Sequence, residues 1–275
     1  MTITDDPANY LRELGQAGDG PHDIARAAVM LSALDHAGRP LEPYLRHLAE
    51  IADHARSESR VTMTAEDGAR SLAALLAGRH GYDGDRLCYD DPNNADFMSV
   101  IDRRRGLPVA LGVLYIHGAR AAGFEASGLN TRGHFLLSIR VRGTEALIDP
   151  YNGGAALDRE ALGTPPRMGS QQPDDPSLAE PVSDIDVLLR LENNLKLRVL
   201  QAGERNRALE IAKHMVLIAP RRADMWIDLA RLNEGAGALG AAQKAYEACL
   251  ALAPQGAALH NEAALALHTL KRRLN

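Results

Sequence analysis

The sequence predicts an α+β domain followed by an all-α repeat array, and three observations support that fold class. Apolar residues recur at helical spacing from about residue 22 to residue 80. After Gly123 the period changes to the alternation of apolar and polar residues that is typical of strands. Near the C-terminus, Pro220 and Pro254 lie 34 residues apart in two similar helical segments. Such a period indicates a helical repeat.

Three amphipathic helices are predicted in the first part of the chain. The stretch "DIARAAVMLSALDHAG" places its apolar residues on one stripe and ends at Gly38. The stretch "PLEPYLRHLAEIADHAR" repeats that pattern. In "TAEDGARSLAALLAG", Thr64 is the expected N-cap and Gly78 the expected stop. The following "YDGDRLCYDDPNNADF" is dense in Asp, Asn, Gly and Pro, so it predicts a loop.

A fourth helix is predicted within "RRRGLPVALGVLYIHGARAAGF", residues 103–124, and it is apolar on nearly every face. Proline in the first turn costs no hydrogen bond, so Pro108 suits the helix start and Gly123 its end. Because the first half has no polar face, it should be enclosed by other elements. The N-terminus of such a helix is where an enzyme would place a thiolate nucleophile. Here that position holds a proline.

Antiparallel strands are predicted after this helix. In "HFLLSIRVRGTEALIDPYNGG" the apolar positions alternate with polar ones, "RGTE" is a turn and "ALID" begins a return strand. Between Gly163 and Pro181 the chain carries five prolines among Gly, Ser, Gln and Asp, which predicts a linker.

The C-terminal segment is predicted to be helical throughout. In "MWIDLARLNEGAGALGAAQKAYEACLALAP" the Trp, Leu, Ala, Tyr and Pro positions have the spacing of a tetratricopeptide repeat. The expected organisation is a flexible N-terminus (1–20), an α+β domain (21–160), a Pro-rich linker (161–183) and helical repeats (184–275).

Several separated motifs resemble the SirB family of bacterial proteins. They are "YDDPNNADFMSVIDRRRGLPVALGVLY", "GLNTRGHFLLSI" and "LIDPYNGG", followed by "VLLRLENNLKLRVLQ" leading into the repeats. The resemblance implies a transglutaminase-like domain with a papain-like core, joined to tetratricopeptide repeats. It implies a fold more strongly than a reaction, because the family is usually described as being of unsettled function.

The same resemblance locates a catalytic triad from which one member is missing. In the related enzymes a cysteine heads the buried helix, a histidine starts a following strand, and an aspartate ends or follows the next strand. His134 and Asp149 match the last two positions, whereas Pro108 stands at or beside the cysteine position. Classical thiol transglutaminase or protease activity is therefore not expected.

The remaining pair has two interpretations. Asp149 could orient His134 as an acid/base, or His134 could be a structural histidine at a strand start. The turn around Gly143 decides whether the two side chains share a face of the sheet, and with a tight turn Asn152 could lie nearer than Asp149.

Other polar residues near the buried helix also have two readings. Asn93 and Asn94 could supply oxyanion donors in a cleft, or could be turn residues. Arg105 could bind an anion at the helix tip, or could pair with Asp102 or a neighbouring acid.

The cysteines and the histidines give weaker candidates. Cys88 could replace the missing nucleophile, but carboxylates surround it; Cys249 is expected to be a packing residue. A metal set of His117, His134 and Asp149 is disfavoured, because His117 would lie roughly 13 Å from the helix tip at about 1.5 Å per residue. No metal site is predicted.

Two functional hypotheses follow. The first is a non-catalytic, pseudoenzyme-like adaptor that binds a protein or peptide through its helical repeats, with the cleft as a further surface. The second is a cysteine-independent hydrolase or amide-processing enzyme that uses His134 and Asp149 to activate water.

Composition argues against other classes of partner. A net charge of −5, with only three Phe and one Trp, disfavours nucleic acid. No stretch approaches the length of a membrane span, and the polar, acidic N-terminus is unlike a signal peptide, so a cytoplasmic protein is expected. The chain has no phosphate-loop or dinucleotide motif, and no cofactor is expected.

Overall fold

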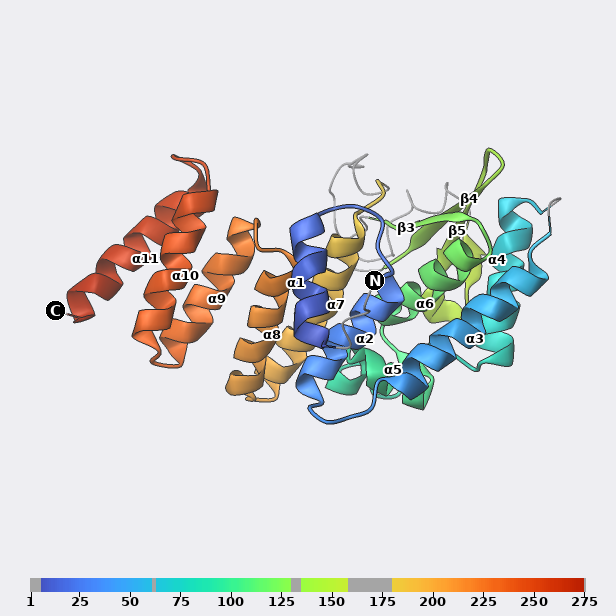
Figure 1. Ribbon diagram of the computed structural model, residues 1–275, viewed down its shortest axis with the longest axis horizontal. Coiled ribbons are helices and arrows are strands. Elements are labelled where there is room, and N and C mark those ends of the chain that lie inside the picture. Colours follow the sequence, from blue (N-terminus) through green and yellow to red (C-terminus); the bar gives the residue numbers. More distant parts are fainter. Residues whose placement is uncertain (1–5, 61–62, 130–134, 158–179, 275) are drawn as a thin grey trace, which may run out of the picture. The chain divides into compact units, whose positions relative to one another are not determined.

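The computed structural model describes residues 6–60, 63–129, 135–157 and 180–274 (Figure 1). The chain divides into two compact units. The central unit comprises residues 19–191, and the terminal unit combines residues 1–18 with residues 192–275.

The four helices predicted in the central unit are present, and a further helix at Phe97–Arg103 was not predicted. Thr64 caps α4 in a capping box with Asp67, as its sequence position indicated. Gly78 does not stop that helix. The chain instead continues as a π-helical turn, η1, and the left-handed residue that follows is Gly81, at φ 74°. The helices are α2 (Ile24–Asp35), α3 (Glu42–Glu58), α4 (Ala65–Ala73), η1 (Ala74–Arg79), α5 (Phe97–Arg103) and α6 (Pro108–Ala121).

Four antiparallel strands form the main sheet in the order β3-β4-β5-β6. Arg142 and Gly143 both have positive φ and join β4 to β5 in a tight two-residue turn. The turn pairs Leu137 with Ile148. The predicted hairpin is present, but its turn is shorter than "RGTE", because Thr144 and Glu145 already belong to β5. The strands are β3 (Glu125–Gly128), β4 (Leu137–Val141), β5 (Thr144–Asp149) and β6 (Ala155–Leu157).

Helix α6 is enclosed, as its apolar sequence predicted. Every residue from Pro108 to Ile116 is buried. Helices α2 and α3 and strand β3 all contact it. Gly112 allows close packing on the sheet side, because a Cβ there would overlap the ring of Phe135. Burial of this helix fixes the position of its N-terminus, where the candidate site is built.

Short elements surround that N-terminus. Strands β1 (Asp83–Gly84) and β2 (Arg105–Gly106) pair in parallel, and β2 is separated from α6 only by Leu107. Two 3-10 turns, η2 (Pro92–Asn94) and η3 (Pro150–Asn152), carry further polar residues of the predicted site.

The terminal unit begins with a helix where a flexible segment was expected. Residues 7–17 form α1 (Pro7–Ala17), whose N-terminus is capped by the Asp6 carboxylate. Leu11 and Leu14 are buried, and α1 packs on α8 (Arg205–Ile218). The expectation for residues 7–17 was wrong because α1 is stabilised by a helix that is distant in the sequence.

Gly15 sets how closely α1 approaches α8, and we expect Gly15→Ala to destabilise this contact by about 2 kcal/mol. A Cβ at this position would overlap the Leu217 carbonyl oxygen and lie 3.1 Å from the Ile218 Cα, and backbone cannot rotate away. The measurement is hydrogen exchange of the α1 amides, which should lose protection.

The matched control is Gly240→Ala, where a Cβ would meet no atom within 4 Å. Because alanine favours helices over glycine by about 1 kcal/mol, this variant should be slightly stabilised. Equal protection of α1 in Gly15→Ala and the wild type would contradict the close approach.

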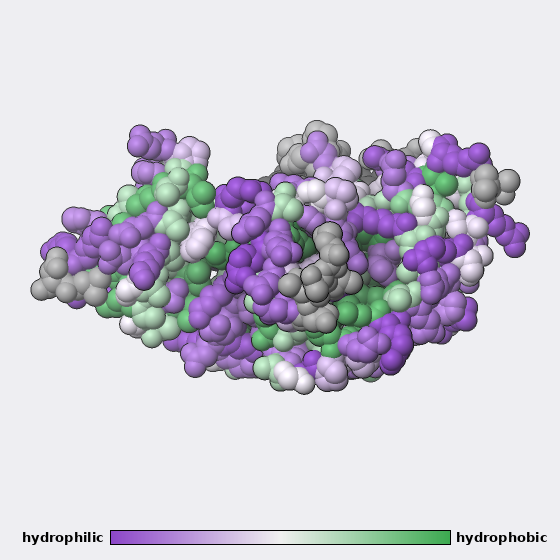
Figure 2. Space-filling model, in the orientation of Figure 1, coloured by the Kyte–Doolittle hydropathy of each residue, from purple (hydrophilic) through white to green (hydrophobic). Residues whose placement is uncertain are grey.

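The other helices of the terminal unit form the C-terminal helical region. Their shared core buries Ala230, Ala242 and Tyr246. Figure 2 shows apolar residues at the surface over α10 and α11, and these helices also carry the exposed Leu252 and Leu265. The elements are α8, α9 (Ala223–Gly235), α10 (Leu239–Leu252) and α11 (Ala258–Leu274), together with the part of α7 (Asp184–Gln201) from Glu192 onward.

The division between the units falls within α7, after Leu191, and not at residue 184 where the repeats were predicted to begin. The start of α7 is anchored to the central unit. Val182 N donates to Gly128 O at 2.9 Å, and Pro181 forms a bridge with Leu129. Most of the predicted 161–183 linker lies outside the described residues.

Candidate functional site

The N-terminus of α6, the position at which the resemblance implied a missing thiol, carries an apolar ring. Pro108 is the first residue of the helix and is buried. The preceding residue, Leu107, donates its N–H to Asn94 O at 2.8 Å. The two cysteines lie elsewhere in the chain: Cys88 is exposed and Cys249 is buried. The residue at this helix tip therefore supplies no nucleophile.

Asn93 and Asn94 are held by turn hydrogen bonds. Asn93 is exposed, and its backbone and side-chain N–H groups both donate to Asp91 Oδ1 at 2.9 Å. Asn94 is fully buried; its Nδ2 donates to Cys88 O at 2.6 Å, and its Oδ1 accepts from Arg103 at 3.2 Å. These bonds match the turn interpretation of the two asparagines, and they tie the 85–91 loop to the α6 tip.

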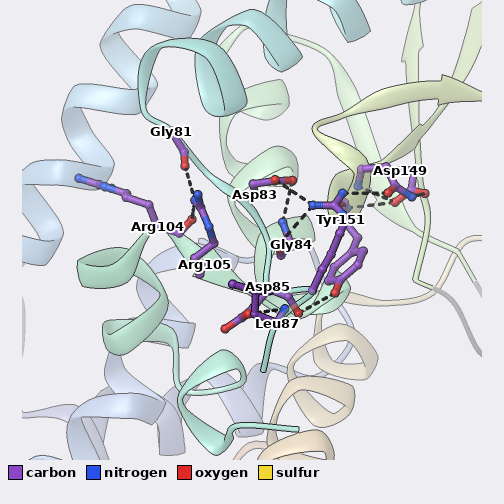
Figure 3. Close-up of polar contacts among 11 residues, drawn as sticks. Gly81, Asp83, Gly84, Asp85, Leu87, Arg104, Arg105, Asp149 and Tyr151 are labelled. Atoms are coloured by element: carbon purple, nitrogen blue, oxygen red, sulfur yellow. Dashed lines mark hydrogen bonds and ion pairs between the residues drawn. The ribbon is translucent and has the colours of Figure 1, made fainter. Parts of the chain in front are cut away.

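Arg105 bonds to backbone carbonyls. Its Nη1 donates to Gly81 O at 2.9 Å and to Arg104 O at 2.8 Å (Figure 3). The predicted pairing with Asp102 is wrong, because Asp102 is bound by Arg39 and by the Tyr44 hydroxyl. Strand β2 is extended, so the Arg105 side chain reaches across to the loop before β1.

Asp149 is the centre of a polar network at the end of β5. The carboxylate is 5% exposed and accepts from Tyr151 N at 3.0 Å and Asn152 N at 3.3 Å. Asn152 Nδ2 donates to the other carboxylate oxygen at 2.6 Å. The structure thus joins two predicted site residues, Asp149 and Asn152. His134 lies outside the described residues, so its pairing with Asp149 stays a prediction.

Arg86 extends this network toward β1. No sequence pattern indicated Arg86 as a site residue. Its guanidinium donates to Asn152 Oδ1 at 3.0 Å and to Tyr151 O at 3.1 Å, and it pairs with Asp83 at 2.9 Å. Figure 3 shows Asp83 and Asp149 on either side of this network, with Tyr151 beside it. Arg86 lies in a stretch that reads only as loop, so no periodicity or motif could have selected it.

An aromatic cluster covers one side of the network. The Tyr151 ring lies 5.3 Å from the Arg86 guanidinium carbon, and the Tyr89 ring meets it edge-on at 5.9 Å. Gly84 makes room for this ring, because a Cβ there would lie 2.5 Å from Tyr151 Cδ2. Burial is the main cause that raises the pKa of Tyr151, whose hydroxyl donates to Asp85 O at 2.8 Å.

The 85–91 loop is fixed by its own hydrogen bonds, and Leu87 projects from it. Asp85 Oδ1 accepts from Leu87 N at 3.1 Å and from Cys88 N at 2.9 Å, and these bonds lower the pKa of the carboxyl, with the Cys88 bond the largest cause. Arg103 donates to the second oxygen at 3.1 Å. The Leu87 side chain is nevertheless 96% exposed. A rigid loop therefore presents an apolar side chain to solvent.

The two cysteines should differ strongly in reactivity toward alkylating reagents. Alkylation requires that the sulfur is accessible to the reagent and that it is deprotonated to the thiolate. We expect iodoacetamide to alkylate Cys88 in the native protein. Cys249 is 0% exposed, and burial raises the pKa of its thiol, so it should react only after denaturation. Mass spectrometry of the peptides measures both. Native labelling of Cys249 would contradict the packing of α10.

The disfavoured metal set of His117, His134 and Asp149 can be compared with the structure only in part. His117 bonds through Nε2 to the Leu48 carbonyl at 2.9 Å, and His134 lies outside the described residues. Within residues 6–60, 63–129, 135–157 and 180–274, no three His, Cys, Asp or Glu side chains are grouped so as to hold a metal ion. Among the same residues, no helix is long and apolar enough to cross a membrane.

Known proteins resemble this chain in sequence. A UPF0162 protein of Xylella fastidiosa (strain Temecula1) is 34% identical over 149 residues, which cover 52% of this chain and 53% of that protein. A UPF0162 protein of Pseudomonas aeruginosa is 28% identical over 192 residues, covering 67% of this chain and 65% of that protein. The matched region thus spans about half the length of the first relative.

A solved structure of menin, described as revealing the binding site for Mixed Lineage Leukemia protein, resembles the chain with a TM-score of 0.44 at 10% identity. It covers 89% of this chain and 69% of menin, and so low a score supports no argument.

A family model identifies the domain itself. The model of the transglutaminase-like superfamily matches residues 42–193, which include α6, the main sheet and the Asp149 network. The matched region is more than half of the chain. The chain therefore belongs to the transglutaminase-like superfamily.

Proposed function

We propose that this protein is a non-catalytic member of its superfamily that acts as an adaptor by binding another protein. The buried Pro108 at the α6 tip supports the non-catalytic part, because a proline ring can neither attack a carbonyl nor donate a proton. Thiol chemistry at this position would require a residue that the chain lacks there.

The exposed Leu87 is the observation that carries the binding part. Burying a leucine side chain is worth about 1.5–3 kcal/mol, so a monomer gains nothing by exposing one on an ordered loop. A rigid loop contributes more binding free energy than a flexible one, because the loop loses no conformational entropy when the partner binds. Three hydrogen bonds to the Asp85 carboxylate supply that rigidity.

The surroundings of Leu87 suit an apolar side chain of a partner. Tyr89 in the same loop is 44% exposed, and its ring packs on Tyr151. Tyrosines are enriched where proteins bind one another, because they bury much apolar area and keep a polar group at the edge. We place the contact at Leu87 and Tyr89, with the C-terminal helices, assigned as tetratricopeptide-type repeats, as the second surface of the adaptor.

Site-specific photo-crosslinking in the full-length chain tests this proposal. Leu87 is replaced by benzoylphenylalanine, and a second variant carries the same group at Leu265, which is 69% exposed on α11 within the second proposed surface. The matched control carries it at the exposed Glu125 of β3, outside both surfaces. We expect one discrete protein adduct from position 87, identified by mass spectrometry, and a clear reduction when Tyr89→Ala is added.

Two results would overturn the role of the loop. One is the absence of any adduct from position 87. The other is the same unselective set of adducts from position 87 and from the control position 125. A discrete adduct from position 265 alone would move the binding surface to the C-terminal helices.

The second candidate, a cysteine-independent hydrolase, has one observation in its favour. Asp149 is buried and held by three donors, as a carboxylate that orients a histidine must be. The test compares amide hydrolysis by the full chain with that by His134→Ala. An activity that survives in His134→Ala removes this candidate.

A further inference from the structure

A cavity of about 330 Å³ lies in the central unit, among α3, α5 and the segment before α3. Its volume is within the range of small-molecule sites. Part of the wall is apolar, and the rest carries charged or polar groups. The apolar part is Pro40, Pro43, Tyr44 and Ile101, and the remaining lining residues are Arg39, His47, Asp102 and Arg104.

The two arginines of this cavity differ in their partners. Arg39 pairs with Asp102, whose carboxylate also accepts from the Tyr44 hydroxyl at 3.1 Å, so that part of the wall is electrically balanced. Arg104 donates to His47 Nε2 and to the Tyr82 hydroxyl, and its guanidinium carbon lies 4.7 Å from the Tyr82 ring centre. Among the described residues, no carboxylate lies within 4.0 Å of the Arg104 guanidinium nitrogens.

His47 does not neutralise Arg104. A guanidinium only donates hydrogen bonds, so His47 Nε2 must be the acceptor and the ring proton must be on Nδ1. The carboxylate of Glu50 lies 3.7 Å from that Nδ1, on the other nitrogen of the ring, and is 55% exposed. The neutral imidazole thus separates Arg104 from the Glu50 charge.

The backbone of Arg104 is also unusual. It adopts φ 57° and ψ 26°, the left-handed conformation that ends α5 and that glycine prefers. A residue with a Cβ costs roughly 1 kcal/mol there. In Figure 3 the side chain points away from Asp149 and Tyr151, so it does not serve the network described above. With this left-handed backbone, the Arg104 side chain lines the cavity.

We propose that this cavity binds a small organic anion whose carboxylate or phosphate pairs with Arg104 and whose apolar body packs on Pro40, Pro43 and Ile101. The site uses one uncompensated cation for the head group and the proline-rich wall for the rest of the ligand. It is independent of the protein-binding surface at Leu87, since none of the lining residues belongs to the 85–91 loop.

Titration of the full-length chain with defined probes tests the site, with backbone amide NMR shifts as the readout. The probes are phenyl phosphate, benzoate, inorganic phosphate and benzyl alcohol. We expect saturable shifts at Tyr44, His47 and Ile101 with the first two probes. The last two should bind more weakly, because each lacks either the apolar body or the charge.

Two variants separate the site from its neighbourhood. Arg104→Gly suits the left-handed backbone, so the fold should persist while binding of both aromatic anions weakens about tenfold or more. Arg105→Ala removes the adjacent, exposed arginine and should leave binding unchanged. The proposal fails if no probe saturates, if inorganic phosphate binds as well as phenyl phosphate, or if Arg104→Gly binds like the wild type.

Discussion

Replacing Asp184 by alanine is expected to lower the free energy of unfolding by about 3–5 kcal/mol. The Asp184 carboxylate is 4% exposed and forms two parallel bonds with Arg120, at 2.7 and 2.8 Å. It also accepts from His22 N at 2.8 Å. Removing it leaves the Arg120 guanidinium, whose side chain is 28% exposed, without its counter-charge, and His22 N without its acceptor.

The loss is large because Arg120 links several elements of the central unit. Its other bonds go to Ala126 O in β3 and His22 O before α2. The measurement is urea unfolding of the full chain. The control is Glu42→Ala, which breaks an exposed pair with Arg46 and should change stability by less than about 0.5 kcal/mol.

A double variant distinguishes the buried charge from lost packing. In Asp184→Leu the unpaired Arg120 remains, whereas adding Arg120→Met removes it and should recover part of the stability. A loss below about 1 kcal/mol in Asp184→Ala would show that the ion pair contributes little to the fold.

Stability should fall by up to about 3 kcal/mol as the pH is lowered from about 6.5 to about 4, owing to His47 alone. The pKa of His47 is lowered to about 4, mainly by burial and also by the nearby Arg104 and His80, while Glu50 opposes them. The Tyr82 hydroxyl also faces the ring, at 2.9 Å from Nε2. The folded state therefore holds His47 neutral where the unfolded chain has already bound a proton.

The sign follows from this difference in proton binding. Between the two pKa values only the unfolded state is protonated, so each step down in pH favours unfolding, and the loss levels off below about pH 4. His80, whose pKa is also lowered mainly by burial, contributes in the same direction.

NMR titration of the His47 ring gives the direct measurement, with a midpoint near 4 expected. In His47→Gln the amide oxygen can still accept from Arg104, and this part of the pH dependence should disappear from urea unfolding curves. A ring midpoint near 6.5, or the same pH profile in the variant, would contradict the buried, neutral state.

The local elements could be predicted because their determinants are local. Thr64 with Asp67, Pro108 at a helix start and Gly143 in a two-residue turn each act within a few residues. Apolar periodicity then indicated that α6 is buried.

Parts of the site could not be predicted from the sequence. Their contacts join residues that are distant in the sequence, or depend on the backbone conformation of the folded chain. Arg86 reaches Asn152 across 66 residues, and nothing in either loop signals the other. For Arg105 the sequence left an anion or a carboxylate as possible partners, but the extended β2 brings the side chain to carbonyl oxygens.

The packing of α1 on α8 has a consequence for synthesis on the ribosome. Arg205, the first residue of α8, is added 188 residues after Ala17, the last residue of α1. At about 5–20 residues per second, the nascent helix waits roughly 10–40 s for its partner. During that interval Leu11 and Leu14 have no core to enter, and the whole central unit has time to fold first. The contact between α1 and α8 therefore forms only after the central unit has been synthesised.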